Sequence, residues 1–68
     1  MKLSARNVLK GTIVEVMRGQ MTAHVRIDVG GTVITSSITS EAVDELGLKP
    51  GMAASAVIKS SDVIIAVD

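Results

Sequence analysis

The chain has 68 residues, no cysteine, one histidine, and seven basic against seven acidic side chains, so its formal net charge is zero. This length gives one small domain, and the lack of thiols excludes disulfides and thiolate metal sites. The balanced charge lacks the basic excess that is typical of nucleic-acid binders. Because 47% of the residues are hydrophobic but none is aromatic, we expect the small core to be completed by obligate homo-oligomerisation.

The first half of the chain predicts three strands. Residues 7–17 form a long first strand with Gly11 as a possible bend or bulge, and residues 18–20 a turn. Residues 22–29 alternate strictly, which predicts one apolar face and one polar face; the apolar residues are Ala23, Val25, Ile27 and Val29, and the polar ones His24, Arg26 and Asp28. The Gly30-Gly31 pair predicts a two-residue hairpin into a third strand at residues 32–38.

The second half predicts one short helix and two more strands. Thr39 or Ser40 caps the helix, Glu41 lies in its first turn, and Gly47 ends it. Residues 49–51 form a turn, and residues 53–59 and 62–67 form the last two strands, joined tightly at residues 60–61. The inward side of the helix is expected at Ala42, Val43 and Leu46. The order predicts an all-β fold, a five-stranded barrel of the oligonucleotide/oligosaccharide-binding (OB) type with one helix between strands three and four.

Catalysis is poorly supported by the residues. A serine nucleophile needs a positioned base, and His24 is the only imidazole, on the polar side of its strand, where its role stays open. Asp44 and Glu45 are adjacent on a helix and point in different directions, so they are a poor pair of catalytic carboxylates. We therefore expect no enzyme activity.

Three polar runs are typical of an oxyanion site instead. Residues 4–7 (SARN) and 59–61 (KSS) each place a cation beside small hydroxyl side chains, and residues 35–40 (TSSITS) lead into the helix start. Charged donors and hydroxyls form short hydrogen bonds to anions. Each run alone has an ordinary explanation as surface, turn or cap residues; their combination points to anion binding.

The chain resembles the molbindin family of small molybdate-binding proteins over essentially its full length, residues 1–68. The resemblance rests on residues 4–7, followed by residues 9–13 (LKGTI), 35–40, 46–51 (LGLKPG) and 58–60 (IKS). It implies barrels assembled as a hexamer, a trimer of dimers with strands exchanged between partners. It also implies molybdate or tungstate bound at subunit interfaces, and extra sites near the threefold axis.

Carried onto this sequence, the resemblance implies a principal site shared by two subunits, in which the metal is held as an oxyanion without direct ligation. One subunit supplies Ser4, Ala5, Arg6, Lys59 and Ser60. Its partner supplies Thr39 and the helix-start N–H groups around Ser40. Ala42 stands where regulator relatives can carry a serine, so one hydroxyl donor is missing there.

The resemblance implies molybdate storage as the function. We expect the cytoplasm as the compartment, because no apolar run approaches membrane-spanning length and residues 1–4 lack the apolar core of a secretory signal. One alternative is an oligomeric interaction module that has lost useful anion affinity. The weakest alternative is single-stranded nucleic-acid binding, which needs aromatic side chains for base stacking. We expect neither nucleic-acid nor membrane partners.

Overall fold

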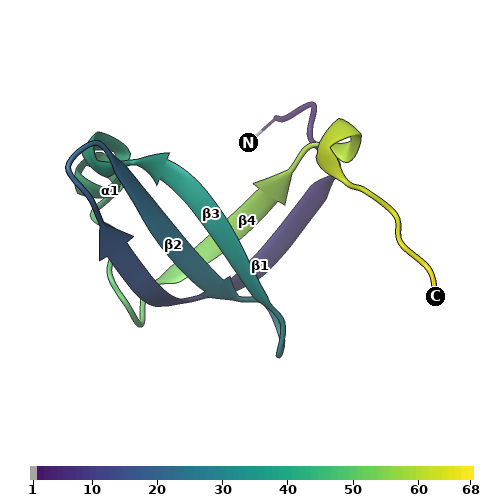
Figure 1. Ribbon diagram of the computed structural model, residues 1–68, viewed down its shortest axis with the longest axis horizontal. Helices are drawn as coiled ribbons and strands as arrows, with labels where there is room; N and C mark the ends of the chain where they lie inside the picture. The colour runs from purple at the N-terminus through teal and green to yellow at the C-terminus, as the bar shows by residue number, and fades with distance from the viewer. Residues whose placement is uncertain (1) are drawn as a thin grey trace.

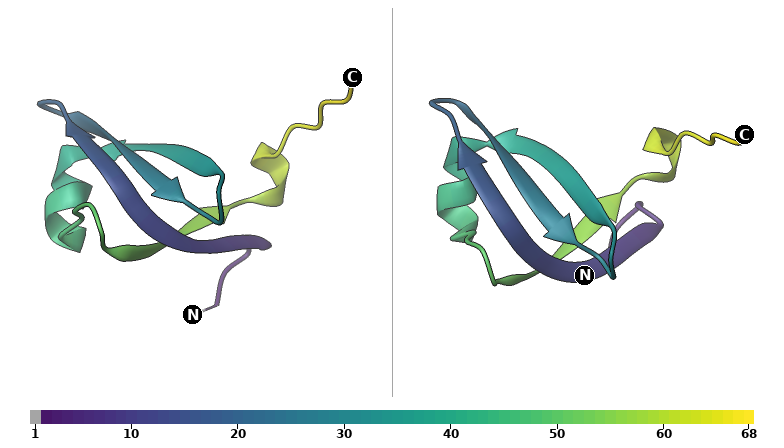
Figure 2. Two further views of the ribbon diagram at one scale, coloured as in Figure 1. Left: turned by 90° about the horizontal axis from the view of Figure 1, so that it is seen from below. Right: turned by 60° about the horizontal axis from the view of Figure 1, so that its bottom comes forward.

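A computed structural model describes residues 2–68. Four strands form one antiparallel sheet in the order β3-β2-β1-β4: β1 (Asn7–Arg18), β2 (Thr22–Asp28), β3 (Val33–Thr39) and β4 (Ala53–Ile58). Helix α1 (Ser40–Leu46) lies between β3 and β4, and a single 3-10 turn, η1 (Ser60–Asp62), follows β4. The sheet curls into a half-barrel with α1 at one end (Figures 1 and 2).

Strand β1 produces the curl because its two halves have different partners. Residues 7–12 pair with β4 and residues 12–18 pair with β2, with a bulge between Ile13 and Glu15. At the change of partner, a Cβ on Gly11 would lie 2.2 Å from the backbone oxygen of Asp28. Only glycine permits this approach, so the predicted bend at Gly11 is a point of close backbone contact, and the bulge lies just beyond it.

The concave side of the sheet holds the core. Ala23, Val25 and Ile27 are buried, as their alternation predicted, whereas His24 and Arg26 lie exposed on the convex side. The other buried apolar residues are Ile13 on β1, Val43 on α1 and Ala56 on β4. This small core is covered by half-buried apolar side chains from β3, from β4 and from the segment after the helix.

The hairpin predicted before β3 and the helix cap predicted after it are both confirmed. The hairpin at Gly30-Gly31 has both glycines at positive φ, and the Val29 N–H donates to the oxygen of Thr32 at 2.8 Å. Thr39 caps α1, because its Oγ1 accepts from the Ala42 N–H at 3.0 Å. Gly47 ends the helix in the left-handed conformation.

Two sequence-based predictions about packing are wrong. Leu46 is not buried: it is 61% exposed at the border of the groove next to α1, and Leu48, after the reversal at Gly47, packs against the core instead. Residues 62–67 do not form a fifth strand: Asp62 belongs to η1, and residues 63–67 follow it without regular structure, with Ile64 91%, Ile65 81% and Val67 91% exposed. The barrel is therefore open, with four strands.

The opening lies between the two edge strands. β3 and β4 are the outer strands of the sheet, and a groove of about 340 Å³ lies between them. Its walls combine apolar and hydroxyl side chains: Ile27, Ile34, Thr35, Ser36, Ser55, Ala56, Val57 and Ile58. A second groove of about 370 Å³ continues toward α1 and is lined mainly by aliphatic residues. One chain alone thus leaves apolar surface and unpaired strand edges uncovered.

Candidate functional site

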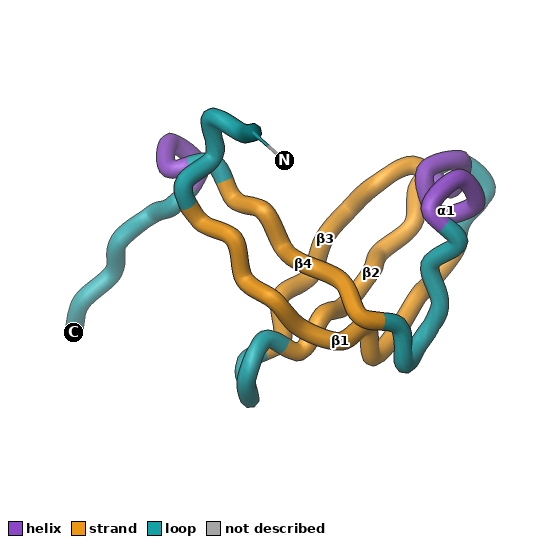
Figure 3. Tube along the Cα trace, turned by 180° about the vertical axis from the view of Figure 1, so that it is seen from behind, coloured by secondary structure: helices purple, strands orange, loops and turns teal. Residues whose placement is uncertain are grey.

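The first and last polar runs meet at one end of the sheet. Antiparallel pairing of β1 with β4 places Asn7 opposite Ile58, and the Asn7 Nδ2 donates to the oxygen of Ile58 at 3.2 Å. The segment before β1 and the turn after β4 therefore start from the same strand end, as Figures 1 and 3 show from opposite sides. Two segments more than 50 residues apart in sequence are neighbours here.

The predicted site residues in these two segments are available to solvent. Ser4, Arg6, Lys59 and Ser60 are exposed, and Ala5 is half-buried. Within residues 2–68 neither Arg6 nor Lys59 makes an ion pair. The η1 turn is held by the Asp62 N–H, which donates to the oxygen of Lys59 at 2.9 Å. The two segments at this end thus carry two cations without an ion pair among residues 2–68 and two exposed hydroxyls.

The third run ends at the opposite end of the half-barrel. Thr39 and Ser40 lie at the start of α1, far from η1 and from the N-terminal segment (Figure 1). A single chain therefore keeps Thr39 and Ser40 apart from the other two runs, although Thr35 and Ser36 of the third run line one groove with Ile58. The family resemblance implied that Thr39 and Ser40 come from a partner subunit, and this stays a prediction.

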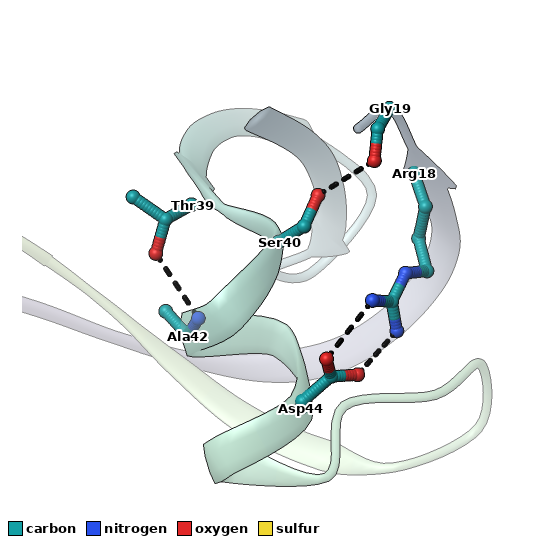
Figure 4. A network of polar contacts seen from close by, with 6 residues as sticks. All are labelled: Arg18, Gly19, Thr39, Ser40, Ala42 and Asp44. Atoms are coloured by element: carbon teal, nitrogen blue, oxygen red, sulfur yellow. Dashed lines mark hydrogen bonds and ion pairs between the residues drawn. The ribbon is translucent and has the colours of Figure 1, made fainter. Parts of the chain in front are cut away.

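The hydrogen bonds at the start of α1 distinguish its two hydroxyls. Thr39 is exposed, and its Oγ1 accepts from Ala42, so the hydroxyl proton is still available for an outside acceptor. Ser40 is 6% exposed; its Oγ donates to the oxygen of Gly19 at 2.9 Å, and its N–H donates to the oxygen of Met21 at 2.9 Å. Both donors of Ser40 are therefore already used within the chain (Figure 4 shows the Oγ contact).

An ion pair that no sequence motif indicated lies beside Ser40. Arg18 Nη1 and Nη2 donate to Asp44 Oδ1 and Oδ2 at 2.5 and 3.1 Å, a two-pronged arrangement between the end of β1 and α1 (Figure 4). The hydrogen bond from Arg18 lowers the pKa of the Asp44 carboxyl, and the same bond raises the pKa of Arg18. The residues are 26 positions apart, so no local spacing could have indicated the pair.

The convex face carries an open depression of about 460 Å³, which is lined by Val14, Glu15, Arg26, Val33 and Thr35. His24 is exposed and lies across from Met17 on β1 and Ser37 on β3. The Arg26 Nε lies 3.6 Å from the Glu15 Oε1, so this cation already has a carboxylate beside it. In the described part of the chain, no three His, Cys, Asp or Glu side chains gather where they could hold a metal ion directly.

None of the helical segments within residues 2–68 has the length and hydropathy that a membrane span requires.

Comparison with known proteins identifies the family. The TOBE domain family matches residues 3–65. Molybdenum-pterin-binding protein 1 of Clostridium pasteurianum is 50% identical over 96% of this chain and 97% of its own length. The chain belongs to the molbindin group of TOBE-domain proteins. This group is a binding family rather than a catalytic one, which confirms the expectation that the molbindin chain is not an enzyme.

Solved structures support the fold of this molbindin. A molybdate-binding protein from Sporomusa ovata matches with a TM-score of 0.94 at 33% identity, covering 98% of this chain and 100% of that one. The cytoplasmic molybdate-binding protein ModG, crystallised with molybdate bound, matches with a TM-score of 0.90 at 57% identity, covering 94% of this chain and 46% of that one. The mostly-β, curled-sheet fold of the family is therefore confirmed.

Proposed function

We propose that this chain binds molybdate as an intact oxyanion at an interface between two copies of itself and serves as an intracellular molybdenum store. One observation carries the proposal: the pairing of Asn7 with Ile58 brings the Arg6 and Lys59 segments to one strand end. Relatives that share nearly the whole chain are named for molybdenum or molybdate. The residue chemistry and the family point to the same ligand.

The donor set suits molybdate. At neutral pH molybdate is a dianion with four acceptor oxygens and no proton to donate, so a site of donors alone satisfies it. Arg6 and Lys59 together balance its two charges, while Ser4 and Ser60 add hydroxyl donors. Phosphate is partly protonated near neutrality and would gain from an acceptor carboxylate. Tungstate has the charge and shape of molybdate, and we propose that it binds as well.

We propose that Thr39 of a second copy completes the site. Its hydroxyl is exposed and keeps a proton to donate, but it lies at the other end of its own half-barrel. A shared site makes binding and assembly interdependent, because a ligand that contacts both copies stabilises their association. Ser40, whose own donors are used, lies behind Thr39 in this arrangement.

The exposed C-terminal segment supports assembly into an oligomer. Residues 63–68 carry Ile64, Ile65 and Val67 almost fully exposed, and Val63 already has extended backbone angles. The groove between the β3 and β4 edges has walls of apolar and hydroxyl side chains, and the edge strands leave backbone groups unpaired. We propose that this segment adds as a strand to a second copy, in a dimer that forms part of a hexamer.

The word pterin in the relatives' names raises a second ligand class. A pterin is a flat ring system that proteins hold by stacking, and this chain has no Phe, Tyr or Trp to stack against it. The grooves of the half-barrel are lined by aliphatic and hydroxyl side chains. The oxyanion is therefore the ligand that the residues favour, and the cytoplasm, where ModG is described, is the compartment that we propose.

Isothermal titration with molybdate, tungstate, sulfate and phosphate tests the ligand. We expect binding of the first two and much weaker binding of the smaller sulfate and of phosphate. Equal binding of all four, or none, would contradict the proposal and leave an oligomeric interaction module as the remaining function. A gel shift with single-stranded DNA at low salt tests the nucleic-acid alternative, because phosphate-driven binding is strongest there.

Sedimentation velocity tests the assembly. Ile65→Lys places a charge in the exposed apolar segment, and we expect it to shift the protein toward smaller species. Val14→Lys is the matched control, because Val14 is 48% exposed on β1 beside Glu15 and Arg26, outside the C-terminal segment and the proposed site. An unchanged sedimentation profile for Ile65→Lys would show that the C-terminal segment does not join the copies.

A further inference from the structure

The start of α1 is fixed to the β1–β2 turn by contacts that leave Thr39 free. Ser40 reaches this turn twice, through its Oγ to Gly19 and through its N–H to Met21, both at 2.9 Å. One helical turn further on, Asp44 accepts both prongs of the Arg18 guanidinium (Figure 4). These contacts hold the helix to β1 and its turn at two points, while Thr39 precedes the first of them directly.

A helix of seven residues does not hold its position by itself, because isolated helices of this length are unstable in water. Its placement depends on Val43, which is 2% exposed in the core, and on the two contacts to the turn. Burial of Val43 fixes the face of the helix that looks inward. The contacts of Ser40 and Asp44 fix its rotation and its distance from the β1–β2 turn.

The Thr39 hydroxyl is oriented by the same helix. Because Oγ1 accepts from the Ala42 N–H at 3.0 Å, one lone pair is directed into the helix and the proton is left for a partner outside. Accepting one hydrogen bond also polarises a hydroxyl and strengthens it as a donor. Thr39 is also the last residue of β3 and pairs with Thr22 on β2, so the sheet holds its backbone. A shift of α1 would therefore act on the direction of the hydroxyl, through the contact with Ala42.

We propose that Ser40 and the Arg18–Asp44 pair are positioning residues for the Thr39 hydroxyl. This inference rests on the proposed function, in which Thr39 of one copy contacts the oxyanion held by another. The affinity for molybdate then depends on an ion pair that does not touch the ligand. A donor that is held in place before binding loses less freedom on binding, so the preorganised site binds more tightly.

A purely stabilising role for the pair predicts different behaviour. Exposed ion pairs contribute little to stability, and such a contribution would be the same whether or not residue 39 carries a hydroxyl. A positioning role acts only through that hydroxyl. The two roles are therefore separated by the affinity for molybdate measured with and without the Thr39 side chain, and not by melting temperature alone.

The test is a double-mutant cycle on the full chain in its natural assembly, read by isothermal titration with sodium molybdate. Asp44→Asn keeps the shape of the side chain and removes its charge; we expect it to weaken binding about two- to fivefold. Thr39→Ala should weaken binding about tenfold. The double variant should bind like Thr39→Ala alone. Ser40→Ala should show the same dependence on Thr39.

Two further variants sharpen the cycle. Arg18→Asp combined with Asp44→Arg reverses the pair, and we expect it to recover most of the affinity that either single change loses. Glu45→Gln is the matched control, because Glu45 is a neighbouring exposed carboxylate on α1 without an ion-pair partner among residues 2–68. It should bind molybdate like the parent.

Each alternative outcome has one meaning. Asp44→Asn could weaken molybdate binding equally in the parent and in Thr39→Ala, or not weaken it at all. Either result would overturn the positioning role while leaving molybdate binding intact. Parent-like binding by Thr39→Ala would remove Thr39 from the site and the positioning role with it. Absence of molybdate binding by the parent chain would overturn the proposed function itself.

Discussion

The two ends of the half-barrel are built in opposite ways. At the α1 end, Ser40 and Asp44 have their polar groups bonded within the chain, and Thr39 keeps one proton free. At the other end, Arg6 and Lys59 are exposed and make no ion pair within residues 2–68. Hydrogen bonds and an ion pair attach the first end to β1 and the β1–β2 turn, whereas the second end carries cations without a carboxylate partner among residues 2–68. The proposed site combines one end of each kind.

Loss of a cation from the open end should give the largest effect on binding. We expect Arg6→Ala and Lys59→Ala each to weaken molybdate binding about 10- to 100-fold, because hydrogen bonds to charged groups contribute about 1.5–3 kcal/mol. The melting temperature without ligand should stay nearly constant, since neither side chain has an ion-pair partner in the described chain. Lys10→Ala, an exposed lysine within β1, is the control. Parent-like affinity in both site variants would refute the assigned site.

A change at Gly11 should disturb both ends at once. The Cβ of Gly11→Ala would lie 2.2 Å from the Asp28 oxygen. The β1 backbone would therefore have to move at the point where its partner changes from β4 to β2. We expect a loss of about 1–3 kcal/mol in the free energy of unfolding, typical of overpacking, measured by urea denaturation. At Gly31, φ is 95° but a Cβ would meet nothing within 4 Å. Gly31→Asn meets the strain of a positive φ but no atomic overlap, and Asn bears that strain better than most residues, so its loss should be smaller. Equal losses would contradict the close-contact explanation.

At the α1 end, the Thr39 side chain should affect stability as well as binding. Removal of an N-cap hydroxyl typically costs about 1 kcal/mol, so Thr39→Ala should lower the free energy of unfolding of the ligand-free protein by about that amount. Thr39→Ser keeps a hydroxyl and should restore most of it. This contrasts with Arg6→Ala, which should change binding alone. A Thr39→Ala protein as stable as the parent would show that the Ala42 contact contributes nothing.

The sequence predicted the local features of the fold well because they depend on neighbouring residues. Alternation in residues 22–28 identified the buried face, the glycine pair at 30–31 required positive φ, and Thr39 had the hydroxyl of a helix cap. Residues 62–67 show the limit of such reasoning. Their apolar character indicates that they pack against something, but it does not say whether the strand edge belongs to the same chain or to another.

The candidate site likewise has features that the sequence could predict and features that only the folded chain reveals. The cation and hydroxyl runs could be found from residue types, but their meeting at one end depends on the pairing of Asn7 with Ile58. The use of both Ser40 donors depends on the β1–β2 turn, about 20 residues away. The Arg18–Asp44 pair likewise joins two elements that only the folded chain brings together. Spacing in the sequence carries no trace of such contacts.

The smallest effect should come from acid. The hydrogen bond from Arg18 lowers the pKa of the Asp44 carboxyl in the folded state, so the folded protein binds this proton less readily than the unfolded chain. The contribution of the pair is then fully present above the unfolded pKa, about 3.9, and is lost as the pH falls through the lower folded value.

Urea denaturation below about pH 4 should show a shallower loss of stability in Asp44→Asn than in the parent, and 1 M salt should reduce the difference. Glu45→Gln, which removes an exposed carboxylate without an ion-pair partner in residues 2–68, should follow the parent curve. Identical curves for Asp44→Asn and the parent would mean that the pair adds nothing to the rigidity of the α1 end.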